Sequence, residues 1–280
     1  MSQFPPPVLD GWYPDPGGRF PHRYWEWGAW TTWVSDDGFI REEPLPDRTA
    51  IAPQAQLPPR SLWWALGGFL VSLFLAVFAS LAAESLTLSL LLSLVTLDVG
   101  LVLTVWIVTR RYGTGSLVDD LGLRFTRHDL AGGVAAGIAA RAVAGAAAIT
   151  ILWLVGEDIE STNVQFDTYE SNDAALYIAL LAAVLVAPFV EEVFFRGLLQ
   201  GVLTRWIGVP AGVAVQAVLF ALIHFQADAS AGANLVLMAA VGVGGAVFGV
   251  AYQMTGRLGS AIVGHAVFNL IASVLILVTR

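Results

Sequence analysis

The side chains of this sequence that could perform chemistry are polar residues placed inside long apolar segments. Four of them stand out: Glu191, His224, His265 and Asn269. A charged group in the middle of a bilayer costs at least ~2.5 kcal/mol on insertion scales, so such residues usually face a bundle interior or a wet cavity. A carboxylate in an apolar pocket can act as a general base, an imidazole can hold the same water, and a second imidazole with an amide can stabilise an oxyanion. The set predicts hydrolysis of an amide bond by activated water, without a serine or cysteine nucleophile.

Helix geometry separates the two adjacent glutamates of the stretch VEEVFFR. Glu192 and Arg196 are four residues apart and share a helix face, so we expect an ion pair between them. Glu191 points about 100° away from Glu192 and is left for another partner. Pro188 lies three residues earlier, where a lost backbone hydrogen bond favours a kink. We therefore predict that Glu191 is the base and that Glu192 with Arg196 supports the helix, as a structural pair or as a support of the site.

The sequence also predicts which residues meet Glu191. The turn RWIGVPAG contains the midpoint between Glu191 and His224, so two antiparallel helices folded there bring these two side chains level. His265 and Asn269 are four residues apart on one later helix and share a face. We expect all four to line one cavity. Two other interpretations stay open, because His224 could be a packed hydrogen-bonding residue and Asn269 could join two helices.

Membrane helices are the elements that must position these residues. Of the 280 residues, 56% are hydrophobic and 13% are charged, against roughly 25% charged residues in an ordinary soluble domain. Cysteine is absent, which excludes a disulfide framework and thiolate chemistry. Apolar runs near the ~20 residues that cross a bilayer predict an all-α polytopic membrane protein. We place seven spans at about residues 62–83, 85–109, 130–155, 174–203, 209–228, 233–254 and 259–279.

The arginines predict the orientation of these spans. All fourteen basic residues are arginines, and those around the spans gather at one set of helix ends: Arg60, Arg110, Arg111, Arg124, Arg127, Arg205 and Arg257. The opposite connection, residues 156–173, has no basic residue. The positive-inside rule then puts the N-terminus in the cytoplasm, and we expect a multi-pass protein of the bacterial cytoplasmic membrane whose cavity opens toward the cytoplasm. Segment 116–130 is too polar to span and is predicted to lie at the interface as an amphipathic stretch.

The first sixty residues differ from the rest. Residues 1–35 are rich in tryptophan, proline and glycine, and the alternation around RYWEWGAWTTWV predicts a small β module of two or three strands packed on tryptophans. Residues 36–61 are acidic and proline-rich, which is typical of a linker. We therefore divide the chain into a cytoplasmic module at 1–35, a linker at 36–61 and a transmembrane domain at 62–280.

Three motifs, in this order on separate apolar helices, resemble those of the CAAX-protease and bacteriocin-processing family, also called the Abi family: Glu191-Glu192-x-x-x-Arg196, Phe220-x-x-x-His224 and His265-x-x-x-Asn269. With the segment DLGLR included, the resemblance covers about residues 116–280. Better-described members have eight helices, so it allows eight in place of seven. The short tryptophan-rich segment in turn resembles a module that precedes membrane segments in many actinobacterial proteins.

The resemblance implies an intramembrane endopeptidase. Glu191 and His224 would activate water, and His265 and Asn269 would stabilise the oxyanion. Phe220 would support the site with the Glu192–Arg196 pair. We favour catalysis without a cofactor; the alternative is zinc held by Glu191, His224 and His265. The sequence lacks the HExxH helix that is typical of a zinc peptidase.

The sequence leaves competing functions open. The expected substrate is a membrane-associated protein or peptide, cleaved as in CAAX prenyl proteases, and the lipid bilayer is the other partner; we expect no nucleic acid. The same fold could serve as a non-catalytic bacteriocin-immunity or scaffold protein, and buried Glu and His also occur in proton-coupled transporters. Arg141, within small residues of the third span, is expected to pack between helices or to balance a glutamate.

Overall fold

The computed structural model describes residues 10–15, 19–26, 29–43, 57–156, 172–226 and 229–279. The chain divides into two compact units, residues 1–53 and residues 54–280, and each is described by itself. Half of the predicted linker at 36–61, residues 44–56, lies outside the described residues.

The first unit contains a four-stranded antiparallel sheet in which each strand pairs with the next along the chain. The strands are β1 (Gly11–Pro14), β2 (His22–Glu26), β3 (Ala29–Asp36) and β4 (Phe39–Glu42). The predicted β module therefore exists, with one more strand than expected and with β4 beyond residue 35.

Tryptophans form only part of the centre of this sheet. Trp25 is buried and meets Trp30 edge-on, with ring centroids 5.1 Å apart. The other part is an ion pair, because the Arg23 guanidinium donates through Nε to Asp15 Oδ1 at 2.8 Å and both side chains are fully buried. A buried pair of this kind replaces apolar packing in a unit too small for a large core.

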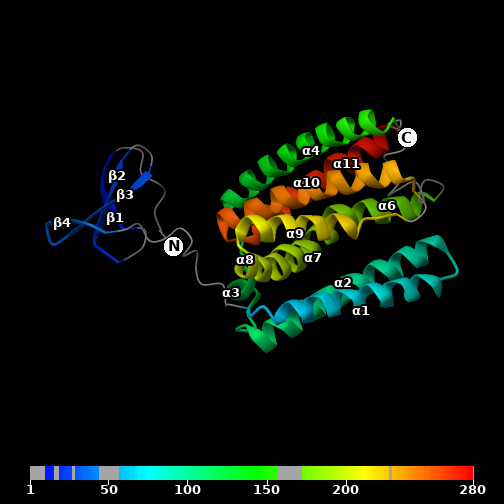
Figure 1. The fold of residues 1–280 in the computed structure, drawn as a ribbon, viewed down its shortest axis with the longest axis horizontal. Coiled ribbons are helices and arrows are strands. Elements are labelled where there is room, and N and C mark those ends of the chain that lie inside the picture. Colours follow the sequence, from blue (N-terminus) through cyan, green and yellow to red (C-terminus); the bar gives the residue numbers. More distant parts are fainter. Residues whose placement is uncertain are drawn as a thin grey trace. The chain divides into compact units, whose positions relative to one another are not determined.

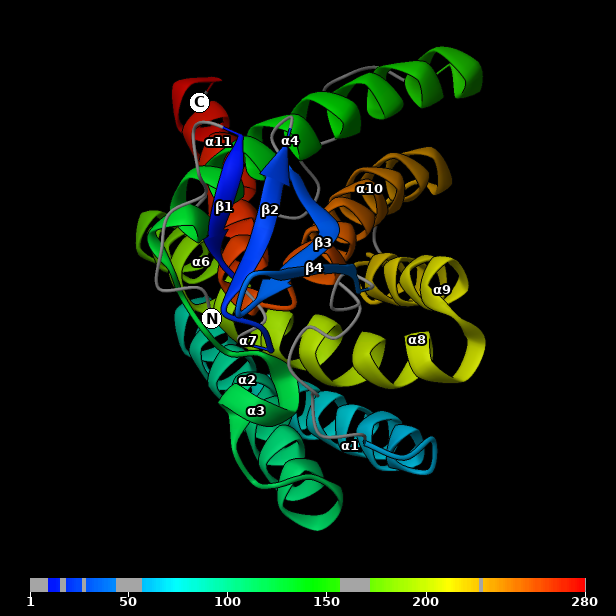
Figure 2. The ribbon, with the colours of Figure 1, turned by 90° about the vertical axis from the view of Figure 1, so that its left-hand side faces the viewer.

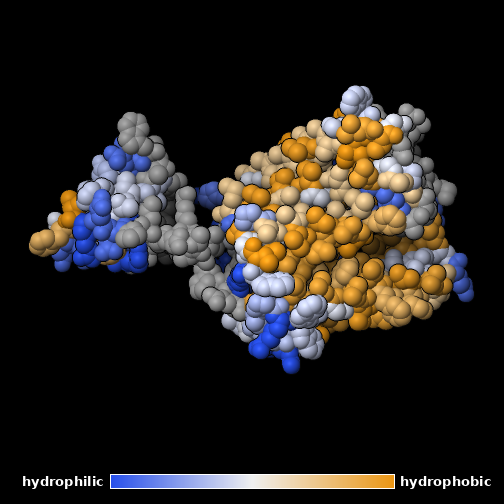
Figure 3. Space-filling view, in the orientation of Figure 1, coloured by the Kyte–Doolittle hydropathy of each residue, from blue (hydrophilic) through white to orange (hydrophobic). Residues whose placement is uncertain are grey.

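The second unit is a bundle of helices whose outer surface is apolar (Figure 1, Figure 3). The helices are α1 (Ser61–Leu81), α2 (Leu86–Tyr112), α3 (Leu117–Leu121), α4 (Arg127–Val155), α6 (Asp173–Leu181), η2 (Ala182–Val186), α7 (Ala187–Glu191), η3 (Glu192–Gln200), α8 (Gly201–Ile207), α9 (Val209–Leu222), α10 (Ala231–Thr255) and α11 (Leu258–Thr279). The segments from α6 to α8 join into one broken helix of 35 residues. The protein is thus an all-α polytopic membrane protein with a small β unit.

Six helices of the described residues are long and apolar enough to cross a membrane, whereas seven were predicted. The difference is α9, which has 14 residues and ends at Leu222, so the predicted span over 209–228 is wrong in length. Hydropathy continues past this point, but the backbone does not remain helical. The Asn234 side chain binds the chain after the turn, accepting from Gln226 N at 2.8 Å and donating to Gln226 O at 2.7 Å.

Small residues bring α4 against α11. A Cβ added at Gly137 would lie 2.5 Å from the carbonyl oxygen of Gly264, so the two backbones meet at a distance that only glycine allows. Figure 2 views the helices from one end, with α4 above α10 and beside α11. This close packing, predicted from the small residues around Arg141, fixes one wall of the site.

Segment 116–130 contains α3 and the start of α4, and part of its side chains are buried in the bundle. Its predicted place at the membrane interface stays a prediction. Asp120 is buried and accepts from Thr114 N at 2.9 Å. Asp129 is buried at the start of α4, where it pairs with Arg257 at 2.9 Å and accepts from Ser260 Oγ at 2.7 Å. Two of its acidic residues are therefore used inward, and one of them, Asp129, ties the start of α4 to the start of α11. Asp119 is exposed and pairs with Arg124.

The broken helix contains two π-helical segments, η2 before Pro188 and η3 after Glu191. Within the first, Ala187 N donates to Ala182 O, which is a hydrogen bond between residues five apart. Wide turns of this kind are rare and often lie at functional sites. The kink predicted at Pro188 thus takes the form of a wide turn that ends where the proline begins the next helical segment.

Candidate active site

The helix segment after Glu191 is packed on all sides. All nine residues of η3, from Glu192 to Gln200, are buried. Arg196 NH1 lies 2.8 Å from Glu192 Oε1, and both side chains have 0% exposure, as expected for the predicted pair. The guanidinium of Arg196 also lies over the Phe220 ring, 4.2 Å from its centroid.

Glu192 has a second partner that the sequence did not indicate. His265 Nδ1 lies 2.8 Å from Glu192 Oε1, while His265 Nε2 lies 3.9 Å from Glu191 Oε2. The imidazole stacks on Phe248 at a centroid distance of 5.4 Å. A carboxylate at Nδ1 fixes that nitrogen as the proton donor and orients the ring. Glu192 therefore acts on the site through His265 as well as on the helix through Arg196.

His224 lies in the turn after α9 and not inside a span. Its Nδ1 is 2.7 Å from the carbonyl oxygen of Phe220, which can only accept, so Nδ1 carries the proton. In the neutral ring this leaves Nε2 as an acceptor. His224 lies near enough to Glu191 and His265 for their charges to interact. In both His224 and His265, a hydrogen bond at Nδ1 thus fixes the orientation of the imidazole.

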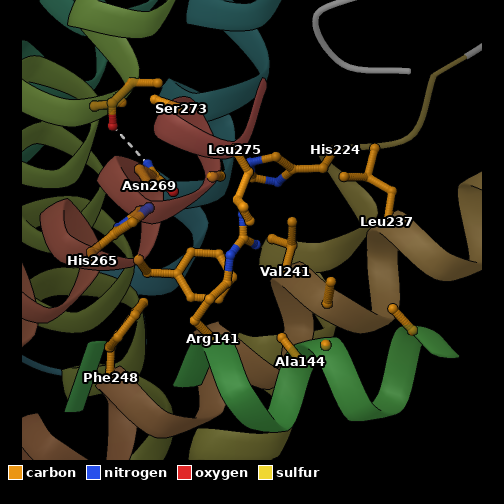
Figure 4. Close-up of a pocket in the computed structure, with 18 of the residues that line it drawn as sticks. Arg141, Ala144, His224, Leu237, Val241, Phe248, His265, Asn269, Ser273 and Leu275 are labelled. Atoms are coloured by element: carbon orange, nitrogen blue, oxygen red, sulfur yellow. Dashed lines mark hydrogen bonds between the residues drawn. The ribbon is translucent and has the colours of Figure 1, made fainter. Parts of the chain in front are cut away.

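Asn269 bonds to the backbone of the broken helix. Its Nδ2 donates to the carbonyl oxygen of Ala183 at 2.6 Å (dashed in Figure 4). In the five-residue pattern of this segment the donor for that carbonyl would be residue 188, and Pro188 has no N–H. Asn269 therefore supplies the missing donor and has one further N–H on its amide.

These side chains line one cavity of about 520 Å³ (Figure 4). The predicted residues on its wall are Glu191, Phe220, His224, His265 and Asn269. Glu192 and Arg196 are not on the wall. Glu191, with a side-chain exposure of 21%, is the acidic residue of this lining, so the split between the two glutamates made from helix geometry agrees with their places in the structure.

The cavity extends from the middle of the bundle to the end away from the arginines. On α11 its lining runs from His265 to Ile276, near the helix end at Thr279. On α10 the lining runs from Phe248 back to Val236, near the helix start. Among the described residues, the arginines at helix ends lie at the opposite side. The sequence predicted that the arginine ends are cytoplasmic and also that the cavity opens toward the cytoplasm. The structure is compatible with only one of these two predictions, because the cavity lies at the end away from the arginines.

Two residues near the site were missed or misjudged. Asp98, in the middle of α2, lies near enough to Glu191 for their charges to interact; the rule that marks charges inside spans would have found it. Arg141 lies over the Phe268 ring at 4.6 Å and lines the cavity. Among the described residues, Arg141 forms no ion pair with a carboxylate, so the structure does not show the predicted pairing of Arg141 with a glutamate.

The donor set could in principle suit zinc, since two imidazoles and a carboxylate are typical ligands of catalytic zinc. Their arrangement does not match that role: in the part of the chain that the structure describes, no group of three His, Asp or Glu side chains could hold a metal ion. Among the described residues, Glu191, His224 and His265 are thus not arranged as a zinc site.

Comparison with known proteins gives one match. The family model for type II CAAX prenyl endopeptidase Rce1-like proteins matches residues 173–271, from the start of α6 to the middle of α11. Neither the curated proteins nor the solved structures gave a match. The matched segment contains all three motifs on which the resemblance was based. The part of the chain that bears the candidate site, residues 173–271, is thus similar to type II CAAX prenyl endopeptidase Rce1-like proteins.

Proposed function

We propose that the protein hydrolyses a peptide bond of a membrane-embedded protein or peptide with water activated by Glu191. One observation carries the proposal: the acidic residue on the cavity wall is Glu191, beside His265 and in charge contact with His224, whereas Glu192 is buried and held by Arg196. A carboxylate exposed to a mainly apolar cavity can accept a proton, whereas one committed to a guanidinium cannot do so without leaving a buried charge.

The chemical step follows from these positions. Glu191 takes a proton from a water molecule as the water oxygen attacks the peptide carbonyl carbon. The carbonyl π electrons move to oxygen and form an oxyanion. When this intermediate collapses, the C–N bond breaks, and the leaving nitrogen receives the proton from Glu191. The immediate products are a carboxylic acid, which keeps the second proton of the water and then releases it to solvent, and an amine. No covalent enzyme intermediate forms.

Both imidazoles have assigned tasks in this scheme. His224, with its Nδ1 bonded to Phe220, offers Nε2 as an acceptor that holds the attacking water beside Glu191. His265 lies between two carboxylates, with Nδ1 2.8 Å from Glu192 Oε1 and Nε2 3.9 Å from Glu191 Oε2. A protonated Nε2 would donate to the oxyanion, together with the remaining N–H of Asn269.

Mass spectrometry of a membrane-peptide library tests the proposal. Wild-type protein in lipid nanodiscs is expected to generate products that Glu191→Gln protein does not. Activity that survives strict chelation supports the metal-free mechanism, whereas activity that zinc alone restores would overturn it. Wild-type protein that is folded but cleaves neither prenylated CAAX peptides nor bacterial membrane peptides would favour the scaffold or immunity alternative.

We also propose that the arginine ends are cytoplasmic and that the cavity opens toward the other side of the membrane. The clustered arginines support the first part, and the cavity lining near the end of α11 supports the second. Because the chain has no cysteine, single cysteines report the side without interference. In intact cells a membrane-impermeant maleimide should label Glu84→Cys, between α1 and α2, and should not label Arg110→Cys. The reverse pattern would show that the cavity faces the cytoplasm.

A further inference from the structure

The hairpin of α1 and α2 carries three exposed arginines where α1 begins and α2 ends: Arg60, Arg110 and Arg111. Among the described residues, none of the three forms an ion pair with a carboxylate. Arg257, also at the arginine ends of the bundle, differs from them because it pairs with Asp129. The end of the hairpin therefore presents positive charge that the described part of the chain does not neutralise.

Two of these arginines share one tyrosine. The guanidinium carbons of Arg60 and Arg111 lie 5.3 Å and 5.6 Å from the centroid of the Tyr112 ring, so they are at most 10.9 Å apart, the sum of these distances. Arg111 also lies over the Trp64 ring at 5.1 Å. Its Nε donates to the Tyr112 hydroxyl oxygen at 3.2 Å, so the hydroxyl proton is available for an acceptor. Arg60, Arg111 and Tyr112 form what we call the arginine–tyrosine cluster.

The third arginine points elsewhere. Arg110 and Arg111 are adjacent on α2, so their side chains leave the helix about 100° apart. The guanidinium of Arg110 lies over the Trp106 ring at 5.7 Å, and a Cβ added at Gly115 would lie 3.0 Å from Arg110 Cδ. The cluster is thus a specific arrangement of two arginines and not a property of every arginine at this end.

The surface next to the cluster is apolar. Trp63, Leu70 and Phe74 are exposed along α1, and Figure 3 shows hydrophilic residues at this end of the hairpin beside the apolar surface of the bundle. Tryptophan rings such as that of Trp64 commonly lie at the level of the lipid headgroups. A ligand that matches both parts needs a compact anionic group joined to long apolar chains.

We propose that the arginine–tyrosine cluster binds the headgroup phosphate of one anionic phospholipid, whose acyl chains lie along α1. Phosphate oxygens match the paired N–H donors of a guanidinium, and the tyrosine hydroxyl supplies a further donor. Basic groups at the ends of membrane helices bind anionic headgroups in this way. The site lies outside the cavity lining, and its assignment does not rest on the proposed hydrolysis.

A bound lipid would also stabilise the hairpin against the helix that carries Glu191. Phe69 of α1 meets Phe194 and Phe195 of η3, with ring centroids 5.9 Å and 6.2 Å apart. A ligand that binds only the folded protein raises its stability by mass action. We therefore expect the anionic lipid to raise the thermal midpoint of the whole bundle.

Native mass spectrometry of the full-length protein in detergent tests the binding. The probes are phosphatidylglycerol and phosphatidylcholine with identical acyl chains, because both carry a phosphate and only the choline cation offsets its charge. The wild type is expected to bind the first phosphatidylglycerol molecule about tenfold more tightly, since hydrogen bonds to charged groups strengthen binding by that order. Arg60→Gln with Arg111→Gln should remove the preference, and Tyr112→Phe should reduce it by about threefold, the loss of one neutral hydrogen bond.

Arg110→Gln is the matched control, because it makes the same change at the residue next to Arg111 but outside the cluster. It should keep the preference for phosphatidylglycerol. An equal loss in Arg110→Gln and Arg111→Gln would show general attraction of anionic lipids to this end and would overturn the proposal. A wild type without the preference, or a double variant that retains it, would overturn it as well.

Thermal midpoints separate lipid binding from unfolding and from binding of a small anion. In phosphatidylcholine the double variant should melt with the wild type, because both arginines are exposed. If it does not, the single variants Arg60→Gln and Arg111→Gln serve as the test, and each should lose part of the preference. Phosphatidylglycerol should raise the wild-type midpoint, and inorganic phosphate at the same concentration should not. An equal rise with inorganic phosphate would assign the cluster to a free anion and contradict the lipid.

Discussion

The two sides of Glu191 along the bundle are built from side chains of opposite size. Toward the arginine ends, the helix that carries it is surrounded by large rings, among them Phe194, Phe195 and Phe220, and all of η3 is buried. Toward the other end, the facing positions on α4 and α10 are small, such as Gly145, and a cavity remains. Aromatic packing holds a charge pair rigid, and small residues leave room for a ligand, so one helix places two adjacent carboxylates in two environments.

Glu191→Gln tests the open side and has the largest expected effect. The activity should fall by about 10²–10⁴-fold, the usual contribution of a general base. The thermal midpoint should stay near that of the wild type, because the Glu191 side chain is partly exposed and a neutral amide of the same shape fits there. Peptide cleavage and differential scanning fluorimetry are the measurements, and unchanged cleavage would remove Glu191 from the mechanism.

Glu192→Gln tests the packed side. It leaves the Arg196 charge buried without its ion-pair partner and removes the anchor of His265. The free energy of unfolding should fall by about 3–5 kcal/mol, measured in detergent by denaturant titration. In the double variant Glu192→Leu with Arg196→Met both charges are gone, and much of the stability should return. A Glu192→Gln protein as stable as the wild type would contradict the division between the two glutamates.

Gly145→Leu closes the open side without disturbing the packed one. A Cβ at Gly145 would meet nothing within 4 Å, and leucine is the better helix former by up to about 1 kcal/mol, so the protein should stay folded. The side chain would occupy the cavity, and kcat/KM should fall by about 10–200-fold. Gly137→Leu is the contrasting control, because its Cβ would collide with the Gly264 carbonyl and should destabilise the bundle. Full activity in a stable Gly145→Leu protein would show that substrate does not use this cavity.

Asn269→Ala has the smallest expected effect. It tests the hydrogen bond from α11 to the wide turn of the broken helix that carries Glu191. It leaves the Ala183 carbonyl without a donor, so the free energy of unfolding should fall by about 1–3 kcal/mol. Ser273→Ala, one turn along the same cavity wall, is the control and should change the free energy of unfolding by less than Asn269→Ala does. A loss of kcat in Asn269→Ala with no loss of stability would instead assign Asn269 to the oxyanion alone.

Relations within one helix could be predicted from the sequence, and relations between helices only in outline. The Glu192–Arg196 pair follows from helical spacing. Folding the two helices at the turn RWIGVPAG predicted that His224 lies level with Glu191, and both residues line the cavity. The same prediction placed His224 within a helix, whereas α9 ends at Leu222. The bond from His265 to Glu192 depends on how α11 docks, and hydropathy carries no information on that.

Backbone hydrogen-bonding patterns were the least predictable feature. Pro188 indicated a kink, but nothing in the apolar run AALYIALLAAVLVAPF distinguishes a simple bend from a π-helical turn. The early end of α9 could not be predicted either. It depends on Asn234, ten residues after His224, whose side chain binds the backbone of Gln226. In both cases a polar side chain from another segment decides the backbone path.

The wide turn at Ala182–Val186 also determines which side chain the chain presents to the cavity. A π-helical turn is equivalent to an α-helix with one residue inserted. If this turn tightened to α-helical hydrogen bonding with the same residues, everything after it would advance by one position and rotate by about 100°. Val190 would then stand where Glu191 stands. Pro188 and Asn269, which favour the wide form, thus act as a register lock, and a shift of one peptide unit would exchange the proposed base for an inert side chain.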